Sequence, residues 1–268
     1  MITTDVVFAG SIPALYDRHL VPMLFEPYAQ DLAERAARTG ARDILETAAG
    51  TGVVTARLFE ALPEARIVAT DLNQAMLDVA AARLPSANVR FQAADAQDLP
   101  FPDQSFDLIV CQFGVMFFPD RIAAYREARR VLRPGGEFLF NAWDRIERNL
   151  GSDLLVNAVA GLFPDSPEGF FRRVPFSYHD VERIESDLLD AGFETVEIET
   201  VEKRSRAGSA RDAAIGLCQG TPLRAEIEAH GPDALERATD AAASALFELE
   251  GPNGLDAPMS AHVARAVR

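Results

Sequence analysis

The sequence of 268 residues predicts an α/β protein in which helices cover both faces of a mostly parallel sheet. Three observations support this prediction. Short apolar runs alternate with helical patterns along the chain, a glycine-rich turn follows the first run, and an acidic residue ends the second. Apolar residues make up 48% of the chain and charged residues 25%, which is typical of a globular domain.

The first half of the chain supplies most of the predicted elements. Apolar residues at helical spacing predict an amphipathic helix over 22–38. Short apolar runs predict strands over 43–46, 66–70, 89–93, 106–111 and 137–142. Helical patterns lie between them over 53–61, 74–83 and 120–132, and Pro134, Gly135 and Gly136 predict a tight turn. Strands joined in this way form a parallel sheet with right-handed crossovers.

Beyond Trp143 the pattern is looser. Helices are predicted over 153–163, 180–191, 211–219 and 232–249. Residues 193–201 alternate between apolar and acidic side chains with one irregular step, which predicts a sixth strand, and 259–267 predict a seventh. No linker separates two autonomous domains, so we expect a single domain over 1–268.

Charge and composition exclude several classes of function. A formal charge of −15 and a pI of about 4.7 argue against binding to nucleic acid or to anionic lipid. No window reaches the roughly 18 uninterrupted apolar residues of a membrane helix, and Asp5 precedes any basic residue, which argues against a signal peptide. Two cysteines and no Cys/His cluster predict a reduced, cytoplasmic protein without a metal site. The oligomeric state is left open.

A glycine-rich turn follows the first predicted strand. Ile44, Leu45 and Glu46 lead into a loop of small residues that contains Gly50 and Gly52 and continues into a helix. Glycines let a ligand approach the backbone closely, and the helix N-terminus offers N–H donors. In open parallel sheets ligands bind at the carboxyl ends of the strands. A tight turn without a ligand is the alternative that the pattern alone leaves open.

An acidic residue, Asp71, ends the second predicted strand. It lies 19 positions after Gly52, close to the spacing of about 20 at which a carboxylate accepts both hydroxyls of a ribose. The alternative is that Asp71 caps the following helix, but Asn73 is an equally good cap. Together with the turn, Asp71 predicts a nucleoside ligand.

Four stretches resemble those of class I S-adenosylmethionine-dependent methyltransferases, most of all the ubiquinone/menaquinone-biosynthesis type. They are Glu46 to Gly52, Asp71 to Leu77, Asp95 to Asp107 and Val131 to Gly136, in this order along the chain. The resemblance covers about residues 44–142. It implies a three-layer Rossmann-like methyltransferase fold with a seven-stranded, mostly parallel sheet and a helical lid, and S-adenosylmethionine as the cofactor. About 43–144 would be the cofactor-binding core, and about 10–40, 150–176 and 207–254 the cover segments.

The resemblance also implies roles for single residues. The residues at the methionine end of the cofactor are Glu46, Gly50 and Gly52, beside Ala48, where the family usually has glycine. The ribose and adenine contacts are Asp71, Leu72, Met76, Asp95 and Ala96, and the residues facing the sulfonium and substrate are Cys111, Gln112 and Phe113. Taken alone, Met76 fits a core residue better, Asp95 a solvated turn residue, and Cys111 an inert buried thiol.

The N-terminal segment offers a candidate base. His19 follows Tyr16 and Arg18 in a segment that resembles the N-terminal cover of related enzymes. We expect Tyr16 or Arg18 to meet the cofactor's carboxylate and His19 to face the methyl acceptor, the alternative being a cap with solvent-facing polar groups. A base helps only where the acceptor is a weakly acidic hydroxyl or a carbon acid.

Other functions compete with methyl transfer. A nicotinamide-dependent oxidoreductase would share the glycine turn and the acidic residue, but Thr55 stands where its third glycine belongs. A non-catalytic regulator that binds S-adenosylmethionine is the second alternative. The expected acceptor is a small, moderately hydrophobic molecule, because the segments 150–176 and 207–254 contain many apolar residues. Whether O, N, S or C accepts the methyl group is left open.

Overall fold

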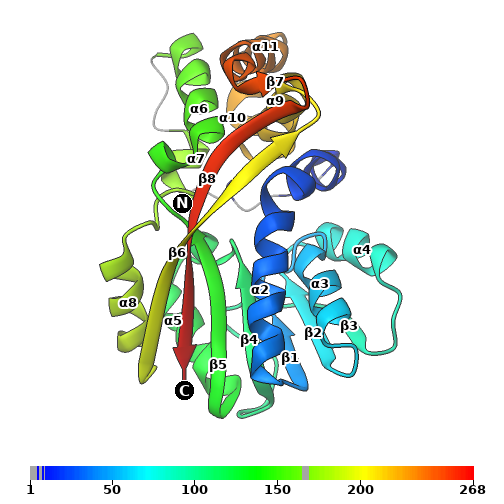
Figure 1. Ribbon diagram of the computed structural model, residues 1–268, viewed down its shortest axis with the longest axis vertical. Coiled ribbons are helices and arrows are strands. Elements are labelled where there is room, and N and C mark those ends of the chain that lie inside the picture. Colours follow the sequence, from blue (N-terminus) through cyan, green and yellow to red (C-terminus); the bar gives the residue numbers. More distant parts are fainter. Residues whose placement is uncertain (1–4, 6–7, 9, 165–168) are drawn as a thin grey trace. The chain divides into compact units, whose positions relative to one another are not determined.

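The structure is a computed structural model that describes residues 5, 8, 10–164 and 169–268 (Figure 1). The described chain divides into two compact units. Unit 1 takes its residues from Met1–Pro27, Trp143–Ser177 and Glu202–Ser260, and unit 2 consists of Tyr28–Ala142, Tyr178–Val201 and Ala261–Arg268. The single domain expected over 1–268 stays a prediction.

Unit 2 contains most of the sheet and the helices on its two faces. Its strands are β1 (Asp43–Glu46), β2 (Arg66–Asp71), β3 (Val89–Ala93), β4 (Phe106–Gln112), most of β5 (Leu132–Trp143) and parts of β6 (Thr195–Ala207) and β8 (Gly254–Val267). Its helices are α2 (Glu26–Thr39), α3 (Val53–Ala61), α4 (Gln74–Arg83), α5 (Arg121–Val131) and α8 (Val181–Asp190), with a short 3₁₀ turn at Val115–Phe117. Helices α2 and α3 lie on one face of the sheet and α5 on the other (Figure 1).

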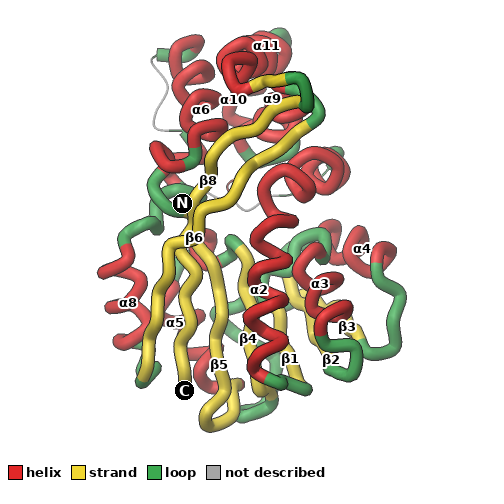
Figure 2. The backbone as a smooth tube through the Cα atoms, viewed as in Figure 1, coloured by secondary structure: helices red, strands yellow, loops and turns green. Residues whose placement is uncertain are grey.

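The sheet has the order β3-β2-β1-β4-β5-β8-β6, with β7 (Glu250–Gly251) paired to β8 (Figure 2). Strands β1 to β5 pair in parallel. Strand β8 runs antiparallel to β5, because Gly135 N donates to Arg268 O while Asp144 N donates to Ser260 O, so the partner number falls as the β5 number rises. The mostly parallel sheet with helices on both faces confirms the predicted α/β fold.

The core of unit 2 lies on both faces of its central strands. Ile44 and Leu45 of β1 and Leu108 and Ile109 of β4 have no exposed surface, as expected for strands covered on both sides. Helix α2 covers one face with its buried apolar stripe, and the hydroxyl of Tyr28 donates to Val201 O at 3.0 Å.

Two elements differ from the prediction for identifiable reasons. The helix expected over 22–38 begins as α2 at Glu26 and is preceded by a π-helix, η2 (Tyr16–Phe25), that contains Pro22. Proline removes an N–H donor and disfavours the regular α-helical ladder before it. The tight turn at Pro134–Gly136 lies within β5, where the pairing shifts from Phe106↔Leu132 to Leu108↔Glu137 and three extra residues bulge out of the ladder.

Unit 1 is mostly helical. Its helices are α1 (Ile12–Leu15), η2, α6 (Leu150–Leu162), α7 (Phe170–Arg173), α9 (Ala210–Gln219), α10 (Leu223–Glu228) and α11 (Ala234–Leu246), with 3₁₀ turns at Ile146–Arg148 and Phe247–Leu249. Helices α6, α9 and α11 correspond to predicted helices, whereas α7 and α10 were not predicted. Within the part of the chain that the structure describes, no helix has the length and apolar character needed to cross a membrane.

Candidate functional site

The carboxyl ends of four adjacent parallel strands bring the predicted site residues of unit 2 to one edge of the sheet. Glu46 ends β1, Asp71 ends β2, Asp95 follows β3, and Gln112 ends β4. In the order β3-β2-β1-β4 these ends are neighbours. Residues separated by up to 66 positions therefore share one edge, as expected for ligand sites of open α/β sheets.

Glu46 is a buried carboxyl group at the end of β1. Only 1% of its surface is exposed, and the hydroxyl of Thr55 donates to its Oε2 at 2.6 Å. Burial raises the pKa of Glu46 from 4.5 to about 8, and the nearby Asp71 carboxylate adds to the rise. Glu46 can therefore gain or lose a proton near neutral pH, depending on what binds beside it.

The loop between β1 and α3 has an unusual backbone. Ala48, Gly50 and Gly52 all have positive φ angles, of 53°, 57° and 80°. Ala49 N donates to Thr70 O at 2.9 Å, which holds the loop against the end of β2. At Gly52, a Cβ atom would lie 2.8 Å from the Cβ of Ala80 in α4, so only glycine lets the helices approach this closely.

Ala48 packs against Gly114, whose missing side chain leaves space for the Ala48 methyl group. A Cβ atom added to Gly114 would lie 2.4 Å from the Cβ of Ala48 and 2.7 Å from Sγ of Cys111. The methyl group of Ala48 thus fills the space that a side chain at position 114 would need.

Asp71 is held by backbone donors from two sides. Gly50 N donates to its Oδ2 at 2.9 Å and Asn73 N to its Oδ1 at 2.8 Å. Burial raises its pKa, and these hydrogen bonds oppose the rise. Its Oδ1 also accepts from the side-chain amide of Asn73 at 3.4 Å, and a carboxylate has about four acceptor sites in all. Asn73 is the N-cap residue of α4, although its side chain makes no capping hydrogen bond.

The residues that follow Asp71 differ in exposure. Leu72 is 61% exposed and is one of few large apolar side chains on the described surface. Met76 is only 3% exposed and packs in the core. An exposed leucine beside a buried carboxylate is available for contact with a flat apolar ligand group, whereas Met76 offers little surface to one.

Asp95 and Ala96 open the connection from β3 to β4. Asp95 is exposed, and its Oδ1 accepts from Gln97 N at 2.8 Å. Asp98 N donates to Asp95 O at 3.1 Å, which closes a tight turn. The Asp95 carboxylate thus lies on the surface of the same sheet edge, partly oriented by its own loop.

The residues at the end of β4 are mostly buried. Cys111 has no exposed surface, and burial raises the pKa of its thiol to about 12, so the side chain is an inert buried thiol. Phe113 has a φ of 48° and 6% exposure, and its N–H donates to Oδ1 of Asn141 at 2.8 Å. Gln112 between them is partly exposed.

The N-terminal candidates lie in unit 1. Nδ1 of His19 is 3.9 Å from Oδ1 of Asp212 in α9, and burial lowers the pKa of His19 below its ordinary value of 6.5. The ring of Tyr16 stacks on that of Phe25 with centroids 4.9 Å apart. His19 is therefore a mostly neutral imidazole at neutral pH, and Tyr16 belongs to an aromatic cluster.

Sequence reasoning missed several residues that contact the predicted site residues or the loops that carry them. Thr55 was noted only as a missing third glycine, yet its hydroxyl holds Glu46. Gly114 was not singled out, yet its lack of a side chain leaves the space that Ala48 fills. Glu127 and Arg130 of α5 were also missed, although a Glu-x-x-Arg spacing places the two side chains on one helix face.

Comparison with known proteins assigns the family. Residues 45–140 match the family described as "Methyltransferase domain". The chain is 32% identical over 176 residues to the ubiquinone/menaquinone biosynthesis C-methyltransferase UbiE of Shewanella frigidimarina. This alignment covers 60% of this chain and 70% of the relative.

Two solved structures show the same fold. The YcgJ protein of Bacillus subtilis is 19% identical with a TM-score of 0.58, over 89% of this chain and 98% of its own. A phosphoethanolamine N-methyltransferase of Haemonchus contortus, solved with S-adenosylhomocysteine, is 18% identical with a TM-score of 0.53, over 85% of this chain and 48% of its own. Neither the oxidoreductase nor the non-catalytic alternative is favoured by these findings. The chain belongs to the class I S-adenosylmethionine-dependent methyltransferases, with S-adenosylmethionine as its cofactor.

Proposed function

We propose that this enzyme transfers the methyl group of S-adenosylmethionine to a small, moderately hydrophobic molecule, with carbon as the favoured acceptor atom. The observation that carries the proposal is the convergence of Glu46, the Gly50–Gly52 turn and Asp71 at one sheet edge. The choice of carbon is supported by the 32% identity to a protein named as a C-methyltransferase. The charge of −15 supports a small molecule over a nucleic acid.

The donor set at the strand ends fits the methionine and ribose parts of the cofactor. Glu46 is proposed to face the cationic amino group, beside the backbone of Ala48, Gly50 and Gly52, because a cation there stabilises its charged form. Asp71 is proposed to accept the ribose hydroxyls with the acceptor capacity that Gly50 and Asn73 leave.

The adenine end is proposed to lie between the strand ends of β2 and β3. The exposed side chain of Leu72 offers an apolar surface for the ring, and Asp95, with the backbone of Ala96, offers an acceptor for its amino group. Met76 is almost fully buried, so its proposed role is to pack beneath Leu72 rather than to contact the adenine ring. Gln112, Phe113 and the backbone of Cys111 are proposed to line the methyl end.

Bound S-adenosylmethionine supplies an electrophilic methyl group, and the chain's own residues orient it and exclude water. When a carbon acceptor takes the methyl group, the S–CH₃ bond breaks as the C–CH₃ bond forms, and the acceptor carbon then loses a proton. His19 is proposed to take that proton, because its lowered pKa keeps the imidazole neutral and able to accept it. Tyr16 and the segments 150–176 and 207–254 are proposed to cover the reacting groups. We place the enzyme in the cytoplasm, in line with two free buried cysteines.

A transfer assay tests this proposal. S-adenosylmethionine labelled in the methyl group is incubated with the full chain and a panel of small phenols, hydroquinones, thiols, amines and carboxylates. We expect label in an apolar aromatic product, with the methyl group located on carbon by NMR. Label on nitrogen, sulfur or oxygen alone would overturn the choice of carbon. Tight binding of S-adenosylhomocysteine without transfer to any acceptor would favour a non-catalytic binder.

A further inference from the structure

The connection from β3 to β4 differs from the other parallel crossovers of the sheet. It runs over residues 94–105, all of which the structure describes, and contains no helix, whereas α3, α4 and α5 form the other crossovers. A helix satisfies its own backbone hydrogen bonds, but an irregular connection needs partners from elsewhere. Asp95 and Ala96, the proposed adenine contacts, open this connection.

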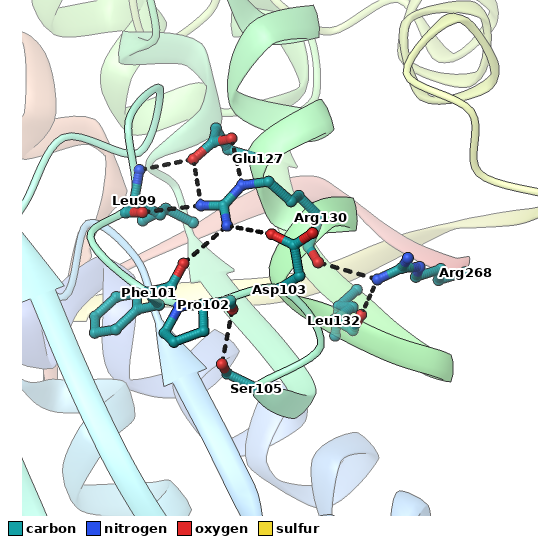
Figure 3. Close-up of polar contacts among 9 residues, drawn as sticks. All are labelled: Leu99, Phe101, Pro102, Asp103, Ser105, Glu127, Arg130, Leu132 and Arg268. Atoms are coloured by element: carbon teal, nitrogen blue, oxygen red, sulfur yellow. Dashed lines mark hydrogen bonds and ion pairs between the residues drawn. The ribbon is translucent and has the colours of Figure 1, made fainter.

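Glu127 and Arg130 of α5 supply those partners (Figure 3). The guanidinium of Arg130 donates to Leu99 O at 2.9 Å and to Phe101 O at 2.8 Å. It also donates to Oδ1 of Asp103 at 2.8 Å. Glu127 completes the arrangement, because Leu99 N donates to its Oε2 at 2.9 Å.

The two side chains also hold each other. Arg130 Nε donates to Oε1 of Glu127 and its terminal nitrogen donates to Oε2, both at 2.8 Å, which is a bidentate pair. The Arg130 guanidinium holds the pKa of Glu127 below its ordinary value. Leu99 is 3% exposed, so its two backbone groups would lose good partners without this pair.

The hydrogen bonds continue from the pair to Asp95. Leu99 follows Asp98, whose N–H donates to Asp95 O at 3.1 Å. Between them, Gln97 donates through its backbone to the Asp95 carboxylate and accepts at Oε1 from Asp120 N, the N-cap residue of α5, at 2.9 Å. Helix α5 therefore holds the connection at two places, at its N-terminus and near its C-terminal end.

We propose that Glu127 and Arg130 are positioning residues for cofactor binding, which hold the 94–105 connection in the conformation that presents Asp95 to the adenine ring. This inference rests on the adenine contact proposed above. Neither side chain is assigned any contact with the cofactor. Their loss is expected to weaken adenine recognition and to leave the contacts at Glu46 and Asp71 intact.

A double-mutant cycle tests the inference. The dissociation constant of S-adenosylhomocysteine is measured by calorimetry for the wild type, Arg130→Met, Asp95→Ala and the double variant. We expect each single change to weaken binding by about tenfold and the double variant to be no weaker than the weaker single variant, since the two residues act as one unit. Arg130→Lys retains a charge but loses the fork geometry and should fall between the wild type and Arg130→Met.

A second ligand separates positioning from general stability. S-inosylhomocysteine carries an oxygen in place of the adenine amino group, so the wild type should prefer S-adenosylhomocysteine and Arg130→Met should lose that preference. Arg126→Met, which removes an exposed arginine from the same helix, is the matched control and should keep it. Melting temperatures report whether each variant is folded.

The outcomes distinguish the inference from the proposal beneath it. Weakened binding in Asp95→Ala with unchanged binding in Arg130→Met, or independent losses that multiply in the double variant, would overturn the positioning role alone. Unchanged binding in Asp95→Ala would overturn the adenine contact itself, and with it the inference.

Discussion

At the scale of single residues, Glu46 has the property that is most open to measurement. Its pKa of about 8 in the ligand-free chain lies above its ordinary 4.5, so the folded chain favours the neutral carboxyl group. The contribution of Glu46 to the free energy of unfolding is therefore fully present below pH 4.5 and is lost as the pH rises through about 8. A bound cation reverses that preference by favouring the carboxylate.

Binding of S-adenosylhomocysteine should consequently strengthen as the pH rises toward 8. The slope cannot exceed about tenfold per pH unit, since one proton is released per ligand bound. In Glu46→Gln the affinity should be weaker and this dependence should disappear. Isothermal calorimetry between pH 6 and 8.5 measures both. An equal slope in the wild type and in the Gln variant would mean that Glu46 does not face the amino group.

The packing of Ala48 against Gly114 makes a prediction about stability. Gly114→Ala places a methyl group 2.4 Å from the Cβ of Ala48, and such overpacking costs about 1–3 kcal/mol of unfolding free energy. Ala48→Gly should recover part of that loss in the double variant, although the contact with Cys111 remains. Urea denaturation gives the four values of the cycle. Strictly additive effects would show that the two positions do not share this space.

Asp71 is expected to contribute strongly to cofactor affinity. Asp71→Ala removes charge-assisted hydrogen bonds worth about 1.5–3 kcal/mol each, so a loss of roughly 2–4 kcal/mol in S-adenosylhomocysteine binding is predicted. Asp71→Asn keeps one carbonyl acceptor for Gly50 or Asn73 and should lose less. If a folded Asp71→Ala variant binds as tightly as the wild type, Asp71 only closes the turn.

At the scale of elements, a buried asparagine joins the start of α6 to β8 and to the residue that follows β5, within unit 1. Asn149 is 3% exposed and donates to the carbonyls of Asp144 at 3.3 Å and Ser260 at 3.1 Å. Its Oδ1 accepts from Ser260 N at 3.1 Å. One amide thus satisfies several buried backbone groups where α6 begins.

Asn149→Ala, at the N-cap of α6, should destabilise the chain more than a change at an exposed position of that helix. Each buried polar group left without a partner costs about 1–3 kcal/mol, so a loss of roughly 2–4 kcal/mol is predicted after partial relaxation. Asn157→Ala, at an exposed position of the same helix, is the control and should stay within about 0.5 kcal/mol of the wild type. Similar denaturation midpoints for both variants would contradict the role given to Asn149.

The elements show where sequence reasoning succeeds and where it ends. Strands β1 to β4 were predicted to within one residue, because buried parallel strands are short apolar runs bounded by turns. Strand β6 was predicted to end at Val201 but continues to Ala207, because residues 202–206 are all polar and show no apolar alternation. Helices α7 and α10 have four and six residues, too few for a helical period to appear.

In the candidate site too, some residues can be predicted from the sequence and others cannot. Glycines and carboxylates at strand ends are local signals, so Gly50, Gly52 and Asp71 could be found from spacing alone. The hydrogen bond from Gly50 to Asp71, the close approach of Ala48 to Gly114 and the contact of Arg130 with Leu99 each join residues more than 20 positions apart. Such contacts exist only once the sheet has formed, and no local pattern encodes them.

At the scale of the whole molecule, the central claim is that the cofactor binds at the carboxyl edge formed by β3, β2, β1 and β4. Unit 2 holds these strands, while His19 and most of the proposed cover segments belong to unit 1. A ligand that engages both sets of residues should slow amide exchange in both units, because covering segments open less often when a ligand is bound.

Hydrogen exchange with and without S-adenosylhomocysteine tests this claim most directly. We predict increased protection at residues 46–52, 71–76 and 95–99 of unit 2, and also at residues 16–20 and within 207–254 of unit 1. Protection in unit 2 alone would remove the cover role of those segments and the case for His19 as the base. Protection that leaves 46–52, 71–76 and 95–99 unchanged would contradict the account, because the cofactor would then bind somewhere other than the strand ends that carry it.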